Sequence, residues 1–134
     1  ILLNSNGEAA LSLNQINNNT PYYLVVKNRN SLETWSALPI TFINDVANYD
    51  FTTSNNKAYG NNLKLINGKW CMITGDVNQD GFIEISDLVN VFINSTLNIG
   101  GYVNTDLNGD SVTNSSDVNI VYQNNISGYS VKKP

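Results

Sequence analysis

The sequence predicts an α+β protein, in which a small all-β, sandwich-like domain over residues 1–74 precedes an α domain over residues 75–134 with two loop–helix motifs. The first half contains short aromatic and β-branched runs between turns rich in Asn and Gly, which is typical of a sheet domain. The second half contains an internal repeat, in which an Asx-rich loop leads into helical periodicity. We expect a piece of a longer protein, in which case the first strands of the β domain lie outside it.

Seven short segments of the first half are candidate strands: 1–3, 9–13, 22–27, 39–43, 49–52, 63–66 and 69–73. Two hairpin turns are predicted among them, at Asn6-Gly7 and at Asn67-Gly68. Asn-Gly favours a type I′ turn, because both residues tolerate the positive φ angles that this turn requires.

The repeat of the second half has copies at residues 75–88 and 105–118, each built around a twelve-residue loop, 76–87 and 106–117. A helical pattern follows each loop, with apolar residues on one face: Leu88, Val91 and Phe92 in the first copy, and Val118, Val121 and Tyr122 in the second. Ser86-Asp87 and Ser116-Asp117 are typical of a helix start. The Gly-Tyr pairs Gly101-Tyr102 and Gly128-Tyr129 are expected to end the two helices.

Negative charge is concentrated in the two loops, which hold seven of the eleven acidic residues. None of the seven basic residues lies between Trp70 and Val131, so no cation is close to the loops in sequence. We expect the acids to repel one another when no metal is bound, and this half of the chain to be partly unfolded in that state.

Composition also excludes several classes of function. The chain has no His, which removes His-based catalytic triads and most zinc sites. It has no basic patch, so nucleic acid is not an expected partner. No apolar run approaches the length of a membrane-spanning helix. Paired carboxylates occur only in the loops, so we do not expect an enzyme within these residues.

Oxygen-donor side chains recur in each loop at the spacing of a calcium site. Ca²⁺ takes six to eight oxygen ligands, and a twelve-residue loop supplies them from positions 1, 3, 5, 7, 9 and 12. In the first loop these are Asp76, Asn78, Asp80, the backbone carbonyl of Phe82, Glu84 and Asp87. In the second they are Asp106, Asn108, Asp110, the backbone carbonyl of Val112, Asn114 and Asp117. The sequence therefore predicts two bound Ca²⁺ ions.

The alternatives are Mg²⁺, which demands a tighter octahedron, and an Asx-rich turn that holds no metal. The second loop is the weaker match, because Ser111 replaces the Gly found at position 6 of the first loop, Gly81. It also has three acids where the first loop has four. We therefore expect weaker calcium binding at the second loop.

The duplicated loops, with Gly75-Asp76-Val77-Asn78 opening the first copy and Asp at position 12 of both, resemble type I-like dockerin domains. The resemblance covers residues 75–134. It implies a secreted bacterial module at the cell surface or outside the cell, which attaches a polysaccharide-degrading parent protein to a scaffold. The implied partner is a cohesin domain, and contact with polysaccharide would come through the parent protein.

In this family the partner is recognised at loop positions 10 and 11, which are Ile85, Ser86, Ser115 and Ser116 here. The near two-fold symmetry of the repeat would allow two binding orientations. The first half, with residues 22–30 and 33–36, is similar to a β segment that precedes such repeats in secreted bacterial proteins.

Two other functions stay open. In the first function, the calcium loops would only rigidify a structural or sorting module that has no cohesin partner. In the second, the β half would bind carbohydrate through Tyr22, Tyr23 or Trp35, although aromatic residues in strands more often belong to a core.

Overall fold

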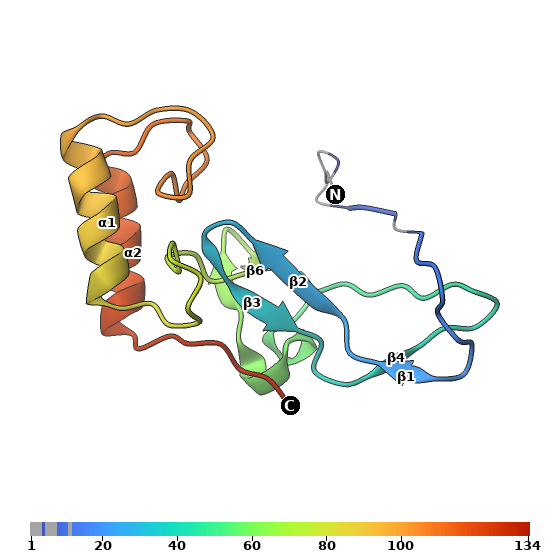
Figure 1. The fold of residues 1–134 in the computed structure, drawn as a ribbon. Coiled ribbons are helices and arrows are strands. Elements are labelled where there is room, and N and C mark those ends of the chain that lie inside the picture. The colour runs from blue at the N-terminus through green and yellow to red at the C-terminus, as the bar shows by residue number, and fades with distance from the viewer. Residues whose placement is uncertain (1–3, 5–7, 11) are drawn as a thin grey trace.

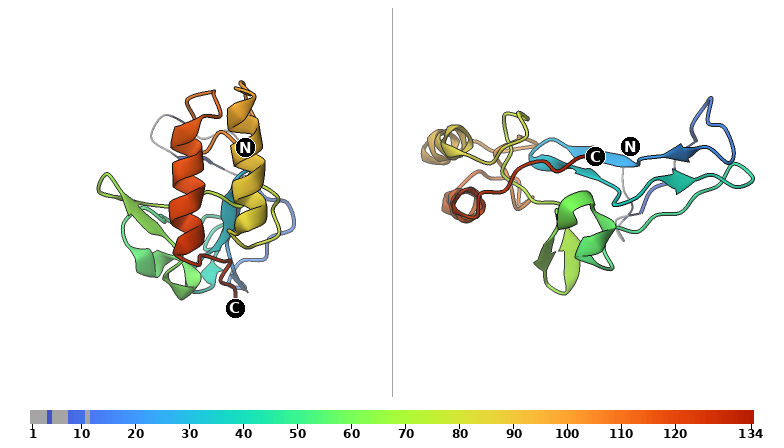
Figure 2. Two further views of the ribbon diagram at one scale, coloured as in Figure 1. Left: turned by 90° about the vertical axis from the view of Figure 1, so that its left-hand side faces the viewer. Right: turned by 90° about the horizontal axis from the view of Figure 1, so that it is seen from below.

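The computed structural model describes residues 4, 8–10 and 12–134. Its elements, in chain order, are β1 (Pro21–Tyr22), β2 (Val25–Asn28), β3 (Ser31–Trp35), β4 (Ile40–Thr41), the 3₁₀ turns η1 (Asn55–Lys57) and η2 (Tyr59–Asn61), β5 (Lys64–Ile66), β6 (Lys69–Cys71), α1 (Ile85–Thr96) and α2 (Ser115–Ile126). The molecule is elongated, with the two helices side by side at one end and the strands along the rest (Figures 1 and 2).

The predicted sandwich is wrong. The strands of the described residues form three separate two-stranded antiparallel sheets, β1 with β4, β2 with β3, and β5 with β6. A sandwich needs two broad sheets whose inner faces interdigitate. None of these strands exceeds five residues, and β3 meets further segments through isolated bridges at Ser31 and Thr34 rather than through a third strand. A mixed arrangement of short hairpins and two helices replaces the sandwich.

Some of the predicted strands are present in the structure and others are not. The Asn67-Gly68 hairpin is confirmed, since β5 pairs with β6 and the turn residues have φ angles of 49° and 79°. Residues 49–52 form no strand, because Asp50 instead accepts a hydrogen bond from the Thr52 backbone N–H at 2.7 Å. The sequence pattern missed β3, which pairs with β2. The hairpin predicted around Asn6-Gly7 falls largely on residues outside the described ones.

Both predicted helices are present, and each starts just before its expected residue. Glu84 and Asn114 are the N-caps, and each forms a capping box with the Asp at the third helical position, Asp87 or Asp117. Gly128 follows α2 with a φ angle of 66°, as expected of a residue that ends a helix. Gly101 does not end α1, which stops at Thr96.

The core lies where the β2–β3 hairpin meets the second half of the chain. Its buried members are Leu32, Ile73, Val77, Ile83, Val91, Leu107 and Val121. They come from β3, the end of the first half, both loops and both helices. The core therefore includes residues from each side of the predicted boundary at residues 74 and 75, and the two-domain division stays a prediction.

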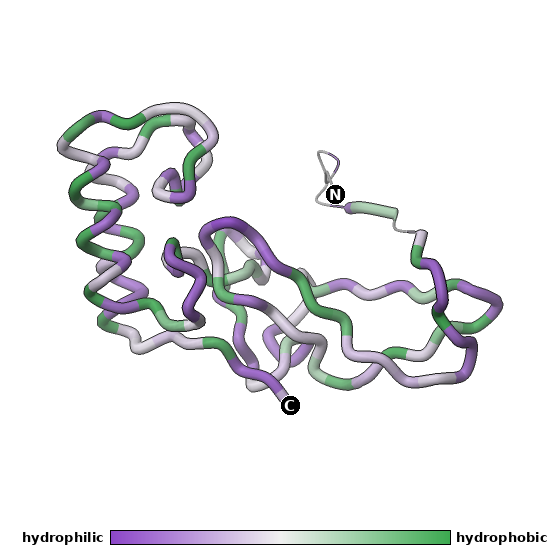
Figure 3. Tube along the Cα trace, in the orientation of Figure 1, coloured by the Kyte–Doolittle hydropathy of each residue, from purple (hydrophilic) through white to green (hydrophobic). Residues whose placement is uncertain are grey.

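Polar stretches mark the loops that precede the helices (Figure 3). Val91 and Val121 are fully buried on the side of the helices that faces the core. Among the described residues, no helix has the length and apolar character needed to cross a membrane.

Candidate metal centre

The Asp at position 12 closes the first loop through hydrogen bonds to the backbone. Asp87 is fully buried, and its Oδ1 accepts from the N–H groups of Val77 and Asn78 at 2.9 and 3.2 Å. Its Oδ2 accepts from the N–H of Glu84 at 3.0 Å. One carboxylate thus joins the start of the loop to its end.

The second loop repeats this arrangement position for position. Asp117 is also fully buried, and its Oδ1 accepts from Leu107 and Asn108 at 2.7 and 3.2 Å. Its Oδ2 accepts from Asn114 at 2.9 Å. The sequence repeat is therefore a structural repeat of the loop framework as well.

The Asp at position 1 organises the turn in the middle of each loop. Asp76 accepts hydrogen bonds from the backbone N–H groups of Asp80 and Gly81, each at 3.1 Å. In the second loop, Asp106 accepts from Gly109 at 2.7 Å and from Ser111 at 3.0 Å. Both position 1 carboxylates are buried, at 2 % and 3 % exposure.

Two left-handed residues shape each loop, at positions 4 and 6. In the first loop these are Gln79 and Gly81, with φ angles of 61° and 91°. In the second they are Gly109 and Ser111, with φ angles of 82° and 71°. Each loop thus has one glycine and one strained non-glycine residue, but in opposite order. Ser111 is therefore strained in the second loop, and the first loop carries a similar strain at Gln79.

The electrostatics of the first loop favour a cation. Burial, together with the nearby charges of Asp87 and Asp80, raises the pKa of Asp76 to about 6, although the hydrogen bond from Gly81 acts to lower it. Among the described residues, neither of the two ion pairs involves an acid of this loop. A cation bound here would relieve a repulsion that the protein itself leaves uncompensated.

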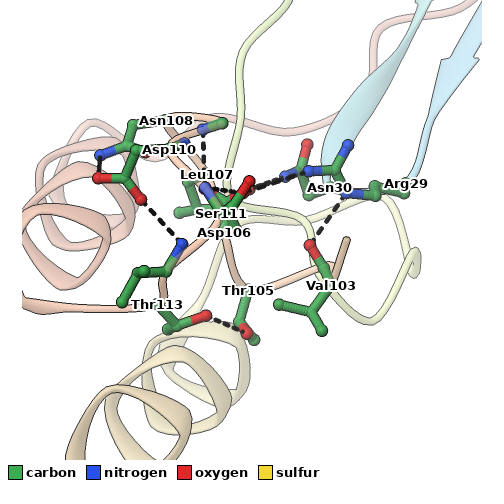
Figure 4. Close-up of polar contacts among 12 residues, drawn as sticks. Arg29, Asn30, Val103, Thr105, Asp106, Leu107, Asn108, Asp110, Ser111 and Thr113 are labelled. Atoms are coloured by element: carbon green, nitrogen blue, oxygen red, sulfur yellow. Dashed lines mark hydrogen bonds and ion pairs between the residues drawn. The ribbon is translucent and has the colours of Figure 1, made fainter. Parts of the chain in front are cut away.

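The second loop has a cation supplied by the β2–β3 turn. The Arg29 guanidinium lies 3.8 Å from Asp106 Oδ2, and it donates to the backbone carbonyls of Val103 at 2.9 Å and Asp106 at 3.4 Å. The Asn30 side-chain amide donates to the Asp106 carbonyl at 2.8 Å. The guanidinium also stacks over the Tyr102 ring, 4.0 Å from its centroid. Figure 4 shows Arg29 and Asn30 reaching this loop from the hairpin.

Arg29 was missed by the sequence analysis, which found no counter-ion for either loop. The contact joins residues 77 positions apart, and no local pattern around Arg29 marks it. Only the packing of the hairpin against the loops brings the two charges together.

The remaining predicted ligands lie on the exposed side of each loop. Asn78 donates to Asp80 Oδ2 at 2.7 Å, as Asn108 does to Asp110 Oδ2 at 3.0 Å. At position 9, Glu84 accepts from the Ser86 hydroxyl at 3.2 Å. The last three predicted ligands belong to positions 7 and 9: Phe82, Val112 and Asn114. The Asn114 side chain donates to the Val112 carbonyl at 3.4 Å, and the backbone N–H groups of Phe82 and Val112 bond to the position 5 carboxylates at 2.9 Å.

The donor set consists of oxygen atoms alone, which fits Ca²⁺ in chemistry. Within the described part of the chain, no three side chains among His, Cys, Asp and Glu gather closely enough to hold a metal. The acids at positions 1 and 12 point at backbone N–H groups, and a calcium loop also uses Asn and backbone carbonyl oxygens. The two calcium ions stay a prediction.

Each loop is also paired with the segment that follows the helix of the other repeat. In the first loop, Ile83 donates to the Tyr129 carbonyl at 3.1 Å, and Val131 donates to the Gly81 carbonyl at 2.8 Å. In the second loop, Thr113 donates to the Ile99 carbonyl at 2.8 Å, and Gly101 donates to the Ser111 carbonyl at 2.9 Å. The two repeats therefore close each other, and neither loop is complete without the other repeat.

The predicted partner-binding residues occupy the first turns of the helices. Ile85 is 64 % exposed, whereas the Ser86 hydroxyl is engaged by Glu84 and Asn78. Ser115 and Ser116 are exposed at the start of α2. Ser115 lies at the edge of an open groove between the helices, and the full lining is Leu88, Val89, Phe92, Ser115, Val118, Asn119 and Tyr122.

The aromatic residues considered for carbohydrate binding pack against other rings. Tyr23 is half-buried and lies edge-to-face against Trp35 and Tyr59, with centroid distances of 6.0 and 6.5 Å. Tyr22 lies edge-to-face against Phe42 at 6.1 Å.

Comparison with protein-family models, curated proteins and solved structures finds no match to this chain. The resemblance to dockerins rests on the loop residues alone.

Proposed function

We propose that this chain is a calcium-dependent protein-binding module that attaches a secreted, polysaccharide-degrading parent protein to a cohesin-like partner. The observation that supports the proposal best is the duplicated loop framework around Asp87 and Asp117. Each copy leads directly into a helix, and the two helices lie side by side (Figure 2). The proposal includes no catalytic step.

Calcium would serve the module as a structural ion. The predicted side-chain ligands at positions 1, 3, 5, 9 and 12 of each loop would hold it, together with the carbonyls of Phe82 and Val112. A bound cation would offset the burial and the neighbouring acidic charges that raise the pKa of Asp76, and binding free energy would add to folding free energy. Because each helix starts within its loop, holding the loop also holds the helix start in place.

The exposed face of the helices is suited to a protein partner. Its apolar residues are each about half exposed or more: Ile85, Val89, Phe92, Ile93, Leu97, Tyr122 and Ile126. Neither helix carries a basic residue, and the only acids, Asp87 and Asp117, are buried. An apolar surface of this kind marks a site of association in soluble proteins. The partner would therefore meet an apolar face bordered by Asn and Ser.

Two experiments test the proposal. Calorimetric titration of the full chain with Ca²⁺ should show two sites in the native sequence, and one site in each of the variants Asp76→Ala and Asp106→Ala. No heat of binding in the native chain would contradict the calcium part.

The partner part requires a purified cohesin panel, tested with calcium and with EDTA. Binding should require calcium, and Phe92→Asp should weaken it at least about tenfold, because a charge would enter a desolvated apolar contact. Leu65→Asp is the matched control, since Leu65 is equally exposed, at 55 %, but lies on β5 and not on either helix. Equal loss in both variants would contradict the assigned face.

The second candidate is a calcium-stabilised structural or sorting module. The contacts that join Arg29 and Leu32 to the loops favour it, because they use the loops to fix the β2–β3 hairpin. Under this function EDTA would unfold the chain while no cohesin bound it with calcium present.

A further inference from the structure

The second loop contains an Asn-Gly dipeptide, Asn108-Gly109, at positions 3 and 4. Both residues are exposed. Asn followed by Gly is the pair most prone to spontaneous loss of the side-chain amide, because Gly has no side chain to shield its backbone nitrogen. The equivalent pair of the first loop is Asn78-Gln79, in which the Gln side chain hinders the same reaction.

In the folded loop, both reacting groups are engaged in hydrogen bonds to other residues. The Gly109 backbone N–H, which would supply the nucleophile, donates to Asp106 Oδ1 at 2.7 Å. The Asn108 side chain, which would be attacked, accepts from the Asp110 N–H at 2.8 Å and donates to Asp110 Oδ2 at 3.0 Å. Figure 4 shows the Asn108 and Asp110 side chains side by side. Reaction therefore requires the loop to open first.

We propose that Asn108-Gly109 is a self-modification site that reacts only while the second loop is open. The Gly109 nitrogen loses its proton and attacks Asn108 Cγ. The bond from Cγ to the side-chain nitrogen breaks, and ammonia leaves, which produces a cyclic succinimide. Water then opens the ring at one of its two carbonyls, and residue 108 becomes either aspartate or isoaspartate.

The two products affect the loop differently. Aspartate keeps an oxygen donor at position 3 and adds one negative charge. Isoaspartate places an extra methylene in the backbone between positions 3 and 4. That insertion displaces Gly109 and Ser111, whose N–H groups are now held by Asp106 at 2.7 and 3.0 Å. A loop that has reacted to isoaspartate can no longer close. The amount of isoaspartate at residue 108 therefore measures how often the loop has opened.

The expectation that calcium slows this reaction rests on the proposed calcium function. A ligand that binds only the closed loop lowers the open population by the factor 1 + [L]/Kd, which is about 100 at 100 times the dissociation constant. The dependence on loop opening itself rests only on the hydrogen bonds described above.

The test is a timed incubation of the full chain at mildly alkaline pH with calcium, with EDTA, and with EDTA plus urea. Peptide mapping by mass spectrometry separates aspartate and isoaspartate at residue 108 from intact Asn. Asn67-Gly68 is the internal reference, because it lies in the β5–β6 turn and belongs to neither loop. The ratio of reaction at Asn108 to that at Asn67 should be at least about tenfold lower with calcium than with EDTA, and Asn108 itself should react fastest in urea.

A matched variant places the same chemistry in the first loop. Gln79→Gly creates an Asn-Gly pair at positions 3 and 4, at a residue whose φ angle of 61° already suits Gly. Asn78 should then react in EDTA and be protected by calcium, while Asn78 in the native sequence reacts far more slowly.

The outcomes separate this inference from the proposed function. If calorimetry shows calcium at the second loop but Asn108 reacts equally fast with calcium and with EDTA, the inference is overturned and the function stands. If calcium does not bind, the function fails, and the inference stands only if Asn108 reacts more slowly in native buffer than in urea. Equal rates in those two conditions overturn it.

Discussion

Residue 111 shows how the two loops share one backbone shape with different side chains. Ser111 adopts a φ angle of 71° at the position that Gly81 occupies in the first loop. A non-glycine residue in the left-handed region costs roughly 1–2 kcal/mol. Since Gln79 carries the same type of strain in the first loop, Ser111 alone does not make the second loop the weaker one.

Ser111→Gly should therefore stabilise the protein. Relief of the left-handed strain outweighs the added freedom of Gly in the unfolded chain, and leaves a net gain of about 0.5–1 kcal/mol. Urea denaturation in the presence of calcium measures it. Gly81→Ala is the mirror variant and should destabilise by about 1 kcal/mol, because Ala at a φ angle of 91° is strained. A loss of stability in Ser111→Gly would contradict this reasoning.

Asp76 predicts a pH dependence of the metal-free protein. Its pKa is raised by burial from 3.8 to about 6, so the folded state binds the proton more tightly than the unfolded state. The stability linked to this group is therefore present below pH 3.8 and is lost as the pH rises through about 6. The Asp76→Asn variant lacks this loss. In EDTA its advantage in melting temperature over the native chain should shrink as the pH falls from about 7 to about 5. A difference independent of pH would contradict the assignment.

At the scale of elements, the β2–β3 hairpin acts as part of the second loop. Its turn supplies Arg29 and Asn30 to Asp106, and Leu32 of β3 is fully buried in the common core. The hairpin is also joined to the segment just before the first loop, because the Leu32 N–H donates to the Ile73 carbonyl at 2.9 Å. The hairpin therefore compensates charge in a loop that is distant in sequence.

Arg29→Gln should have opposite effects on folding and on metal binding. In EDTA the variant should lose about 1–2 kcal/mol of stability, because Asp106 is left buried without its cation. Its second loop should bind calcium more tightly, since a neighbouring positive charge no longer opposes the ion. Urea denaturation and calorimetry measure the two effects.

The control for that variant is Lys27→Gln. Lys27 forms an ion pair with Glu33 at 2.6 Å, but its side chain is 70 % exposed. Removing an exposed pair should cost under about 1 kcal/mol and leave both calcium affinities unchanged. Weaker calcium binding at the second loop in Arg29→Gln would show that its positioning contacts outweigh its charge.

Local signals allowed the loops, the helices and the Asn67-Gly68 hairpin to be predicted, because each depends on residues close together in the chain. The sandwich prediction failed for the opposite reason. Alternating short strands do not reveal which strands pair, and the strands of the described residues pair two by two. The same limit hid Arg29, whose partner lies 77 residues away. In the candidate site, the spacing of Asp and Asn predicted the repeated framework around Asp87 and Asp117, but not the inequality of charge between the two loops.

At the scale of the whole molecule, metal removal should loosen far more than the loops. Two Ca²⁺ ions would carry four positive charges, equal in size to the formal net charge of −4. Because Val77 and Leu107 of the loops belong to the core that also holds Leu32, opening the loops exposes the β2–β3 hairpin too. EDTA should therefore reduce the helical circular dichroism signal and the amide-exchange protection of β3 together. Loss of helix with full protection of β3 would contradict a shared core.

Because each loop is held closed by a segment distant in sequence, proteolysis at that segment can open the loop. Val131, close to the C-terminal end of this chain, holds the Gly81 carbonyl of the first loop. Cleavage of the chain between Tyr129 and Val131 would therefore open the first loop, although the cut lies some fifty residues further along the chain. The bond from Gly101 to the Ser111 carbonyl would still hold the second loop closed. Residues 129–131 hold the first loop closed, so the lifetime of that loop in a protease-rich medium depends on how well these residues are shielded from cleavage.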